Sequence, residues 1–320
     1  GMLWLVIVAL GLPQSSFIAD VAALLLFAFF VIMPLVLRLV VVPLSQTWPA
    51  RLGVVVIGGQ PLAALIAGAA MLPLPLPLPL PLSLRVMGAS VWLFYTLLVA
   101  ACGIQVVWQQ QQDSAAWCRG AALIYLPIGA AWYLAAQAHI APLGLARALV
   151  WLTAAHFHYI PLVALTMTGL VGAQPSVRQN RLAWLVYRAV AAGMLGLPLL
   201  VALGISLTQL TGNTAVETLA ALLQALTVLA LGGLLLRYVV PASASPLART
   251  GLAVAGGAVF VSMAAAGGFA LGNATGGWAI TYSQMLLIHG GVNALLFGAC
   301  GLWGWVANAH DPRPHITGER

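Results

Sequence analysis

Two histidines and a tyrosine lie within a four-residue stretch of an otherwise apolar segment. The segment reads AHFHYIPL and contains His156, His158, Tyr159 and Pro161. Imidazole can act as a general acid or base near neutral pH, and the neutral ring is a ligand for zinc, copper, iron or haem iron. Side chains three apart share a helix face, which joins His156 to Tyr159, whereas side chains two apart point about 200° apart. His158 can therefore reach the site of His156 only if Pro161, which interrupts the hydrogen-bond ladder, distorts the helix.

A second group of polar residues lies on the last apolar segment, ITYSQMLLIHGGVNALLFGACGLWGW. Tyr282, His289 and Asn293 are spaced seven and four residues apart, so they share one face of a helix. Polar groups on one stripe of an apolar helix should face protein or a water-filled cavity, and not lipid. The alternative is that these side chains only bridge helices, since such hydrogen bonds contribute roughly 0.6–2 kcal/mol in membranes.

The elements that must position these residues are membrane-spanning helices. The chain is 62% hydrophobic and 5% charged, whereas a soluble domain carries roughly a quarter charged residues. This composition predicts an all-α, polytopic transmembrane helical bundle, preceded by a short N-terminal hydrophobic segment. We expect residues 1–307 to form a single transmembrane domain and residues 308–320 a short tail. Nine full spans are predicted, at residues 17–37, 53–72, 86–108, 119–138, 148–172, 188–209, 215–237, 250–271 and 279–307.

The distribution of arginine predicts the orientation of the bundle. The net charge of +7 rests on twelve basic residues, all arginine, and these are spread singly between apolar runs. Such spacing is typical of a topology signal, so no nucleic-acid partner is expected. If the 38–52 loop is cytoplasmic, ten arginines lie inside and only Arg85 and Arg147 lie outside. We therefore expect a protein of the cell (inner) membrane with a cytoplasmic C-terminus.

This orientation brings the two polar groups to a similar depth. His156 and His289 would lie ~12 and ~15 Å from the outer ends of their spans. His158 would lie one step deeper, and His139 at the outer mouth. The predicted ligand-binding site lies in the outer half of the bundle and consists of His156, His158, Tyr159, Tyr282, His289 and Asn293. His156, His158 and His289 are its candidate metal ligands, for a metal ion or for haem.

Other features of the sequence carry little chemistry. Cys102, Cys118 and Cys300 lie far apart without a CxxC pair, so neither a disulfide framework nor a thiolate metal site is expected. No carboxylate lies at the predicted midplane, which argues against a pump built on central carboxylates. The PLPLPLPLPL repeat at 73–82 cannot be helical and should form an extended outer loop.

Three separated segments resemble those of one bacterial family. AAHFHYIPLVALTMTGL resembles the HFHF-type motif of YndJ-like membrane proteins, and IHGGVNALLFGACGLWGW resembles their HG-x-x-NALxF-x-x-x-GLxGW segment. FAFFVIMPLVLRLV is similar to their early P-L-x-L-R-L segment, so the resemblance covers about residues 24–305. Tyr159 stands where Phe is usual, and IPL replaces a glycine-containing step. The resemblance implies a fold and a membrane location more than an activity, although members are sometimes labelled transporters.

Three classes of function remain open. The first is a binding or redox site for a metal, haem or small ligand at the histidines. The second is a transporter or permease of a small solute that uses the proline-kinked HFHY helix. The third is a membrane enzyme that acts on a lipid through histidine acid–base chemistry. In each case the partners are the lipid bilayer and a small molecule.

Overall fold

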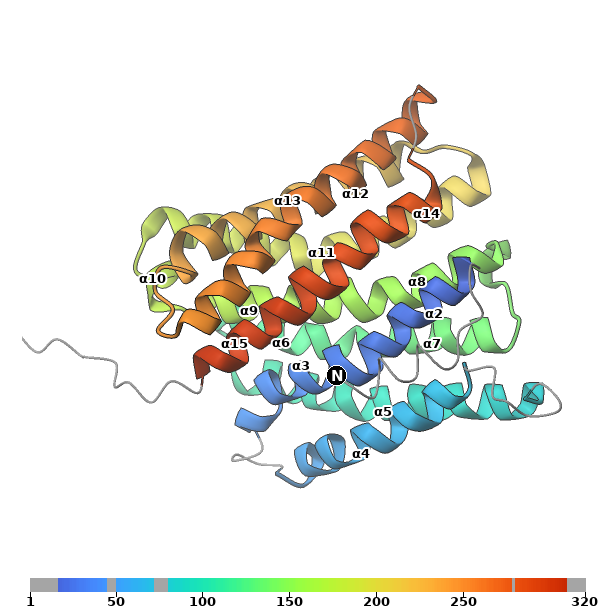
Figure 1. Cartoon of the computed structure of the whole chain (residues 1–320), viewed down its shortest axis with the longest axis horizontal. Coiled ribbons are helices and arrows are strands. Elements are labelled where there is room, and N and C mark those ends of the chain that lie inside the picture. Colours follow the sequence, from blue (N-terminus) through green and yellow to red (C-terminus); the bar gives the residue numbers. More distant parts are fainter. Residues whose placement is uncertain (1–16, 45–49, 72–79, 278–279, 310–320) are drawn as a thin grey trace, which may run out of the picture.

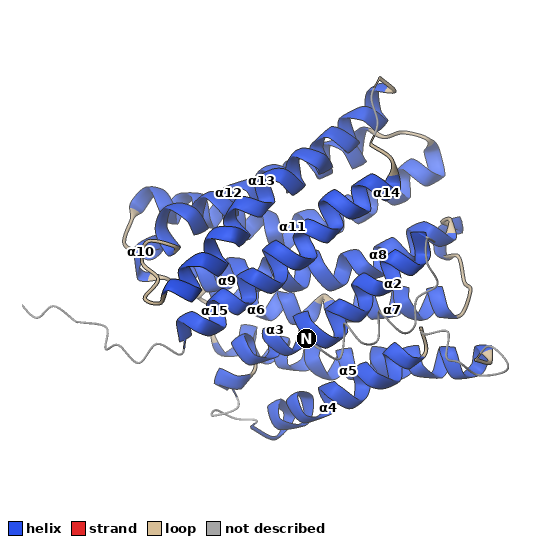
Figure 2. Cartoon of the chain, viewed as in Figure 1, coloured by secondary structure: helices blue, strands red, loops and turns tan. Residues whose placement is uncertain are grey.

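The computed structural model describes residues 17–44, 50–71, 80–277 and 280–309, and every regular element in these ranges is a helix (Figure 2). In chain order the elements are α2 (Phe17–Phe27), the π-helical η1 (Ala28–Ile32), α3 (Met33–Val40), the 3-10 turn η2 (Val42–Leu44), α4 (Ala50–Ala69), α5 (Leu82–Gln109), α6 (Ser114–Ile124), α7 (Leu126–Gln137), the 3-10 turn η3 (Pro142–Gly144), α8 (Arg147–Tyr159), the π-helical η4 (Ile160–Leu165), α9 (Thr166–Gly172), α10 (Pro175–Arg178), α11 (Arg181–Thr211), α12 (Ala215–Leu234), the π-helical η5 (Leu235–Val239), α13 (Pro246–Thr275), α14 (Tyr282–Met285), the π-helical η6 (Leu286–Gly291) and η7 (Asn293–Cys300), and α15 (Gly301–Ala309).

These elements combine into nine spans that are long and apolar enough to cross a membrane, within the described part of the chain. The prediction of an all-α, multi-pass helical bundle is therefore confirmed. The first span, for example, runs over Phe17–Val40 through α2, η1 and α3, and the last runs over Ser283–Ala309. The short N-terminal hydrophobic segment, residues 73–79 of the PLPL repeat and residues 310–320 of the tail lie outside the described residues, and Leu82 at the end of the repeat is the first residue of α5.

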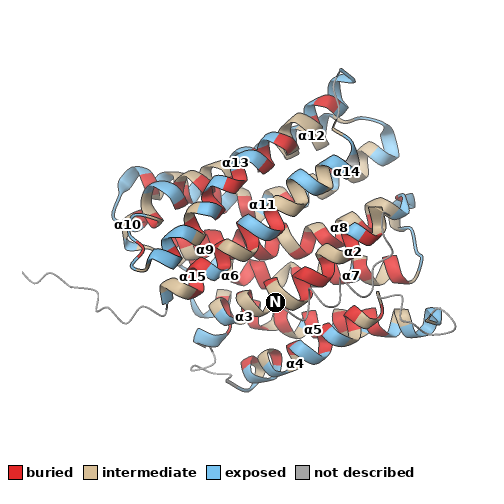
Figure 3. Cartoon of the chain, in the orientation of Figure 1, coloured by how far each residue is buried: buried red, intermediate tan, exposed pale blue. Residues whose placement is uncertain are grey.

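The spans lie side by side with their long axes roughly aligned (Figure 1). Helices adjacent in the chain pack as antiparallel neighbours, as α5 does with α4 and α6, and α12 does with α11 and α13. Buried residues concentrate where α2, α5, α6, α7 and α8 meet, and exposed residues on the outer helices (Figure 3). We call one end of the bundle the His139 end, where residues 138–146 and 212–214 connect helices, and the other the Arg178 end, where residues 173–180 do so.

Close approach between helices depends on glycine. A Cβ atom on Gly103 of α5 would lie 2.5 Å from the carbonyl oxygen of Gly120 on α6, and one on Gly232 of α12 would lie 2.9 Å from that of Gly256 on α13. Small residues of this kind allow backbones to approach in a membrane, where packing replaces the hydrophobic effect as the main source of association.

Candidate functional site

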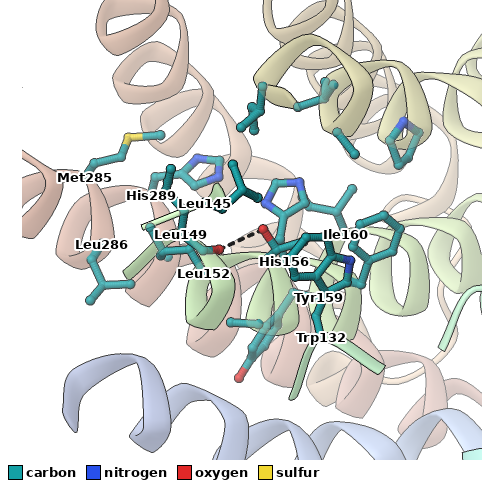
Figure 4. A pocket seen from close by; sticks show the side chains of 18 of the residues that line it. Trp132, Leu145, Leu149, Leu152, His156, Tyr159, Ile160, Met285, Leu286 and His289 are labelled. Atoms are coloured by element: carbon teal, nitrogen blue, oxygen red, sulfur yellow. Dashed lines mark hydrogen bonds between the residues drawn. The ribbon is translucent and has the colours of Figure 1, made fainter. Parts of the chain in front are cut away.

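A cavity of about 260 Å³ opens between α8, α11 and the last span, in the half of the bundle toward the His139 end (Figure 4). Its volume is near the lower limit of small-molecule pockets, which are typically ~300–1,000 Å³. Most of its wall is aliphatic or aromatic. The apolar side chains include Leu145, Leu149, Leu152, Ile205, Met285 and Trp132.

His156 and His289 both line this cavity, and their imidazole rings project from separate helices into the same space (Figure 4). The Nε2 atom of His156 is fully buried and has no hydrogen-bond partner among the described residues. Because nearly all buried polar groups in native proteins have a partner, this nitrogen is an unusual feature of the cavity wall.

His289 belongs to a small polar cluster between the last span and α13. Its Nδ1 lies 3.1 Å from the carbonyl oxygen of Ser262, and the hydroxyl of Ser262 donates to Oδ1 of Asn293 over 2.9 Å. A proton on Nδ1 satisfies the Ser262 carbonyl and leaves Nε2 as an acceptor, which lies 3.5 Å from Nδ2 of Asn293. The spacing of His289 and Asn293 therefore does place both on one face, and that face is turned to protein and to the cavity.

Two other predicted residues have different surroundings. Tyr159 lines the cavity with its ring, but its hydroxyl donates to the carbonyl oxygen of Leu24 over 2.7 Å and ties α8 to α2. Tyr282 begins α14, and its side chain lies outside the described residues.

The structure places His158 away from the cavity, on the opposite face of α8. Its ring is 1% exposed, accepts a hydrogen bond at Nε2 from the indole of Trp92 over 2.9 Å, and donates from Nδ1 to Ala154 over 2.7 Å. The ring also packs against Phe29, with 5.2 Å between ring centroids. Nε2 therefore joins α8 to α5 and Nδ1 bonds within α8, so both ring nitrogens are used, and of the three predicted histidines only His156 and His289 line the cavity.

The position of the helix distortion explains this outcome. A π-helical segment does follow the HFHY sequence, as expected from Pro161, but it starts at Ile160. Residues 147–159 remain regular α-helix, so His156 and His158 keep their angular separation of about 200°. The distortion instead changes the direction of the residues after Tyr159.

The close packing around His158 gives a prediction about stability. A Cβ atom on Gly129 of α7 would lie 2.7 Å from Nδ1 of His158 and 3.0 Å from Cβ of Phe157. We expect Gly129→Ala to destabilise the protein by ~1–3 kcal/mol through overpacking, measured as a lower midpoint of thermal unfolding in a fixed detergent. Gly196→Ala on α11 is the matched control, since its Cβ meets nothing within 4 Å and alanine is the better helix former. Equal midpoints for the two variants would contradict this account of His158.

Sequence reasoning did not identify two residues of this region. Glu217, in the first turn of α12, lines the cavity, and Ser262 on α13 completes the His289 cluster. Each is a polar residue within an apolar helix, which is a usable signal, but only the packing of α11, α12 and α13 shows which cavity or cluster it joins. The described residues include no group of three or more His, Cys, Asp or Glu side chains that could hold a metal ion. His156 and His289 would thus supply two of the four ligands that a structural zinc usually takes.

Comparison with known proteins gives two matches. A family model described as "YndJ-like protein" matches residues 23–297, a range that includes all the residues that line the cavity. A protein of Bacillus subtilis (strain 168) named "Uncharacterized membrane protein YndJ" is 26% identical over 234 residues, which cover 71% of this chain and 39% of the relative. The chain thus spans about two fifths of the length of that relative. No solved structure shows significant similarity to the chain.

Proposed function

The chain belongs to the YndJ-like family of membrane proteins, and we propose that it binds an amphipathic small molecule in the cavity between α8, α11 and the last span. The apolar part of the ligand packs against the leucine-rich wall. Its polar group contacts the imidazoles of His156 and His289. By the arginine distribution the His139 end faces outward, so the ligand enters from the outer side of the cell membrane.

The observation that carries the proposal is the unpartnered Nε2 of His156. A buried polar atom without a partner costs about 1–3 kcal/mol. A ligand with a hydroxyl, amide or ammonium group offsets that cost when it donates to the ring. The apolar wall and few polar groups are also typical of sites that bind small molecules.

A photoreactive alcohol tests the proposal. We expect a ten-carbon primary alcohol with a diazirine at the end of its chain to label the protein saturably in nanodiscs, and excess 1-decanol to prevent the labelling. Ala202→Phe should abolish the saturable component, because Ala202 lines the cavity on α11 and phenylalanine would fill it. Ala264→Phe on the exposed face of α13 is the matched control and should label like the wild type. Equal labelling of both variants would contradict the proposal.

Metal and haem are the competing occupants, and the same preparation distinguishes them. A Soret band in the UV–visible spectrum of the purified protein would indicate haem. A stoichiometric metal that is lost in His156→Gln and His289→Gln would indicate a metal site. Either result would replace the amphipathic ligand in this proposal.

A second candidate function is transport of the same ligand. Helix irregularities border the cavity on two sides, at η4 and η6, and Pro198 lies inside α11 where that helix lines the cavity. Interrupted helices beside a binding site are common in transporters, where they allow one part of the bundle to move. Efflux of preloaded probe from proteoliposomes, faster than from protein-free liposomes and blocked by Ala202→Phe, would favour transport over binding alone.

A further inference from the structure

We propose that the cavity selects an amphipathic amine, with the ammonium group at Glu217; this inference rests on the proposed function and specifies its ligand class. Of the described residues that line the cavity, Glu217 is the only one with a formal charge, and none is an arginine. The cavity therefore has a negative charge, two imidazoles and apolar walls. This combination complements a cation attached to an apolar body.

The carboxylate of Glu217 is available for such a ligand. Within the described residues, the one ion pair joins Arg178 to Asp113 at the Arg178 end, and no hydrogen bond involves the side chain of Glu217. The side chain is half-buried. A carboxylate in this position loses part of its hydration without gaining a cationic partner from the protein, so a ligand ammonium would form the missing pair.

The backbone holds Glu217 firmly against the cavity wall. Its Cα packs on Gly204 of α11, and a Cβ atom added to Gly204 would lie only 2.6 Å from the Cα of Glu217. An acidic residue in the first turn also interacts favourably with the helix dipole of α12. The interaction with the helix dipole would be equally favourable at any position of the first turn. It therefore does not explain why the carboxylate occupies the position that lines the cavity.

The partial burial of Glu217 increases the expected selectivity. Attraction between two charges about 4 Å apart is several times stronger at the effective dielectric of a protein than in bulk water. We therefore expect an amine to bind ~10-fold more tightly than the alcohol of equal chain length, a difference that corresponds to ~1.4 kcal/mol. An anionic amphiphile of the same length should bind more weakly than the alcohol, because its charge repels Glu217.

Competition between matched amphiphiles tests the inference. Decylamine, 1-decanol and decanoate would each compete with the photoreactive alcohol in nanodiscs of zwitterionic lipid. In the wild type we expect decylamine to compete at ~10-fold lower concentration than 1-decanol, and decanoate at higher concentration than both. Glu217→Gln should remove the preference for the amine, so that decylamine and 1-decanol compete at similar concentrations. Asp20→Asn is the control, since Asp20 is also an acidic residue in a first helical turn toward the His139 end but does not line the cavity.

The outcomes separate the two proposals. Equal competition by decylamine and 1-decanol in the wild type, or an amine preference that persists in Glu217→Gln, would overturn the amine assignment while the proposed binding site stands. An amine preference lost equally in Asp20→Asn would also overturn it, because the preference would then reflect general surface charge. Failure of 1-decanol to compete at all would instead contradict the proposed function.

Discussion

Replacing His156 with leucine should raise the stability of the protein and weaken its binding of 1-decanol by about 10-fold. The stability rises because the substitution removes a buried nitrogen that has no partner, an atom that costs about 1–3 kcal/mol. Leucine has a similar size and would lie among the apolar side chains of the cavity wall. Binding falls because the ligand loses its hydrogen bond to the imidazole. Thermal unfolding and competition with the photoreactive alcohol measure the two effects on one preparation.

The opposite signs make this result diagnostic. If His156 only packed helices together, its replacement would lower the stability of the protein and would not change the binding of 1-decanol. His156→Leu with a lower unfolding midpoint and unchanged 1-decanol competition would therefore contradict the assignment of His156 to the site.

His158→Leu, two residues away on the same helix, should lower the stability of the protein and leave its binding of 1-decanol unchanged. The substitution leaves the indole N–H of Trp92 buried without an acceptor and removes the hydrogen bond to Ala154. We expect a loss of ~1–3 kcal/mol in the free energy of unfolding, with 1-decanol binding of the folded protein unchanged. Chemical or thermal unfolding in a fixed detergent measures the loss.

The double variant Trp92→Phe/His158→Leu is the control for this explanation. Replacing both partners by apolar groups should recover part of the stability that His158→Leu loses, because no buried donor then lacks an acceptor. If the double variant is less stable than His158→Leu by the full cost of Trp92→Phe alone, the hydrogen bond does not explain the loss.

The number and approximate limits of the spans were predictable from sequence because they depend on local composition. Apolar runs of sufficient length must be helical in a membrane, since their backbone groups have no other partners there. The similar depth of His156 and His289 in the bundle was also predictable, because depth can be counted from the ends of two helices. That count requires only the boundaries of the spans.

The surroundings of His158 and Glu217 depend on contacts between distant parts of the chain. His158 meets Trp92, which is 66 residues earlier, and no periodicity within α8 predicts that pairing. The π-helical start at Ile160 also decides which residues change direction, and Pro161 alone does not specify that start. Glu217 joins the cavity because α12 packs on Gly204 of α11, a contact that hydropathy does not encode.

The position of the covalent label tests the central claim most directly. After irradiation with the diazirine alcohol, peptide mass spectrometry of the wild type should find competable adducts on residues of α8, α11 and the last span that line the cavity, such as Leu152, Ile205 and Met285. These adducts should disappear in Ala202→Phe and remain in Ala264→Phe. Adducts spread over lipid-exposed residues such as Phe94 and Leu226, unaffected by excess 1-decanol, would contradict the claim that this cavity is a ligand-binding site.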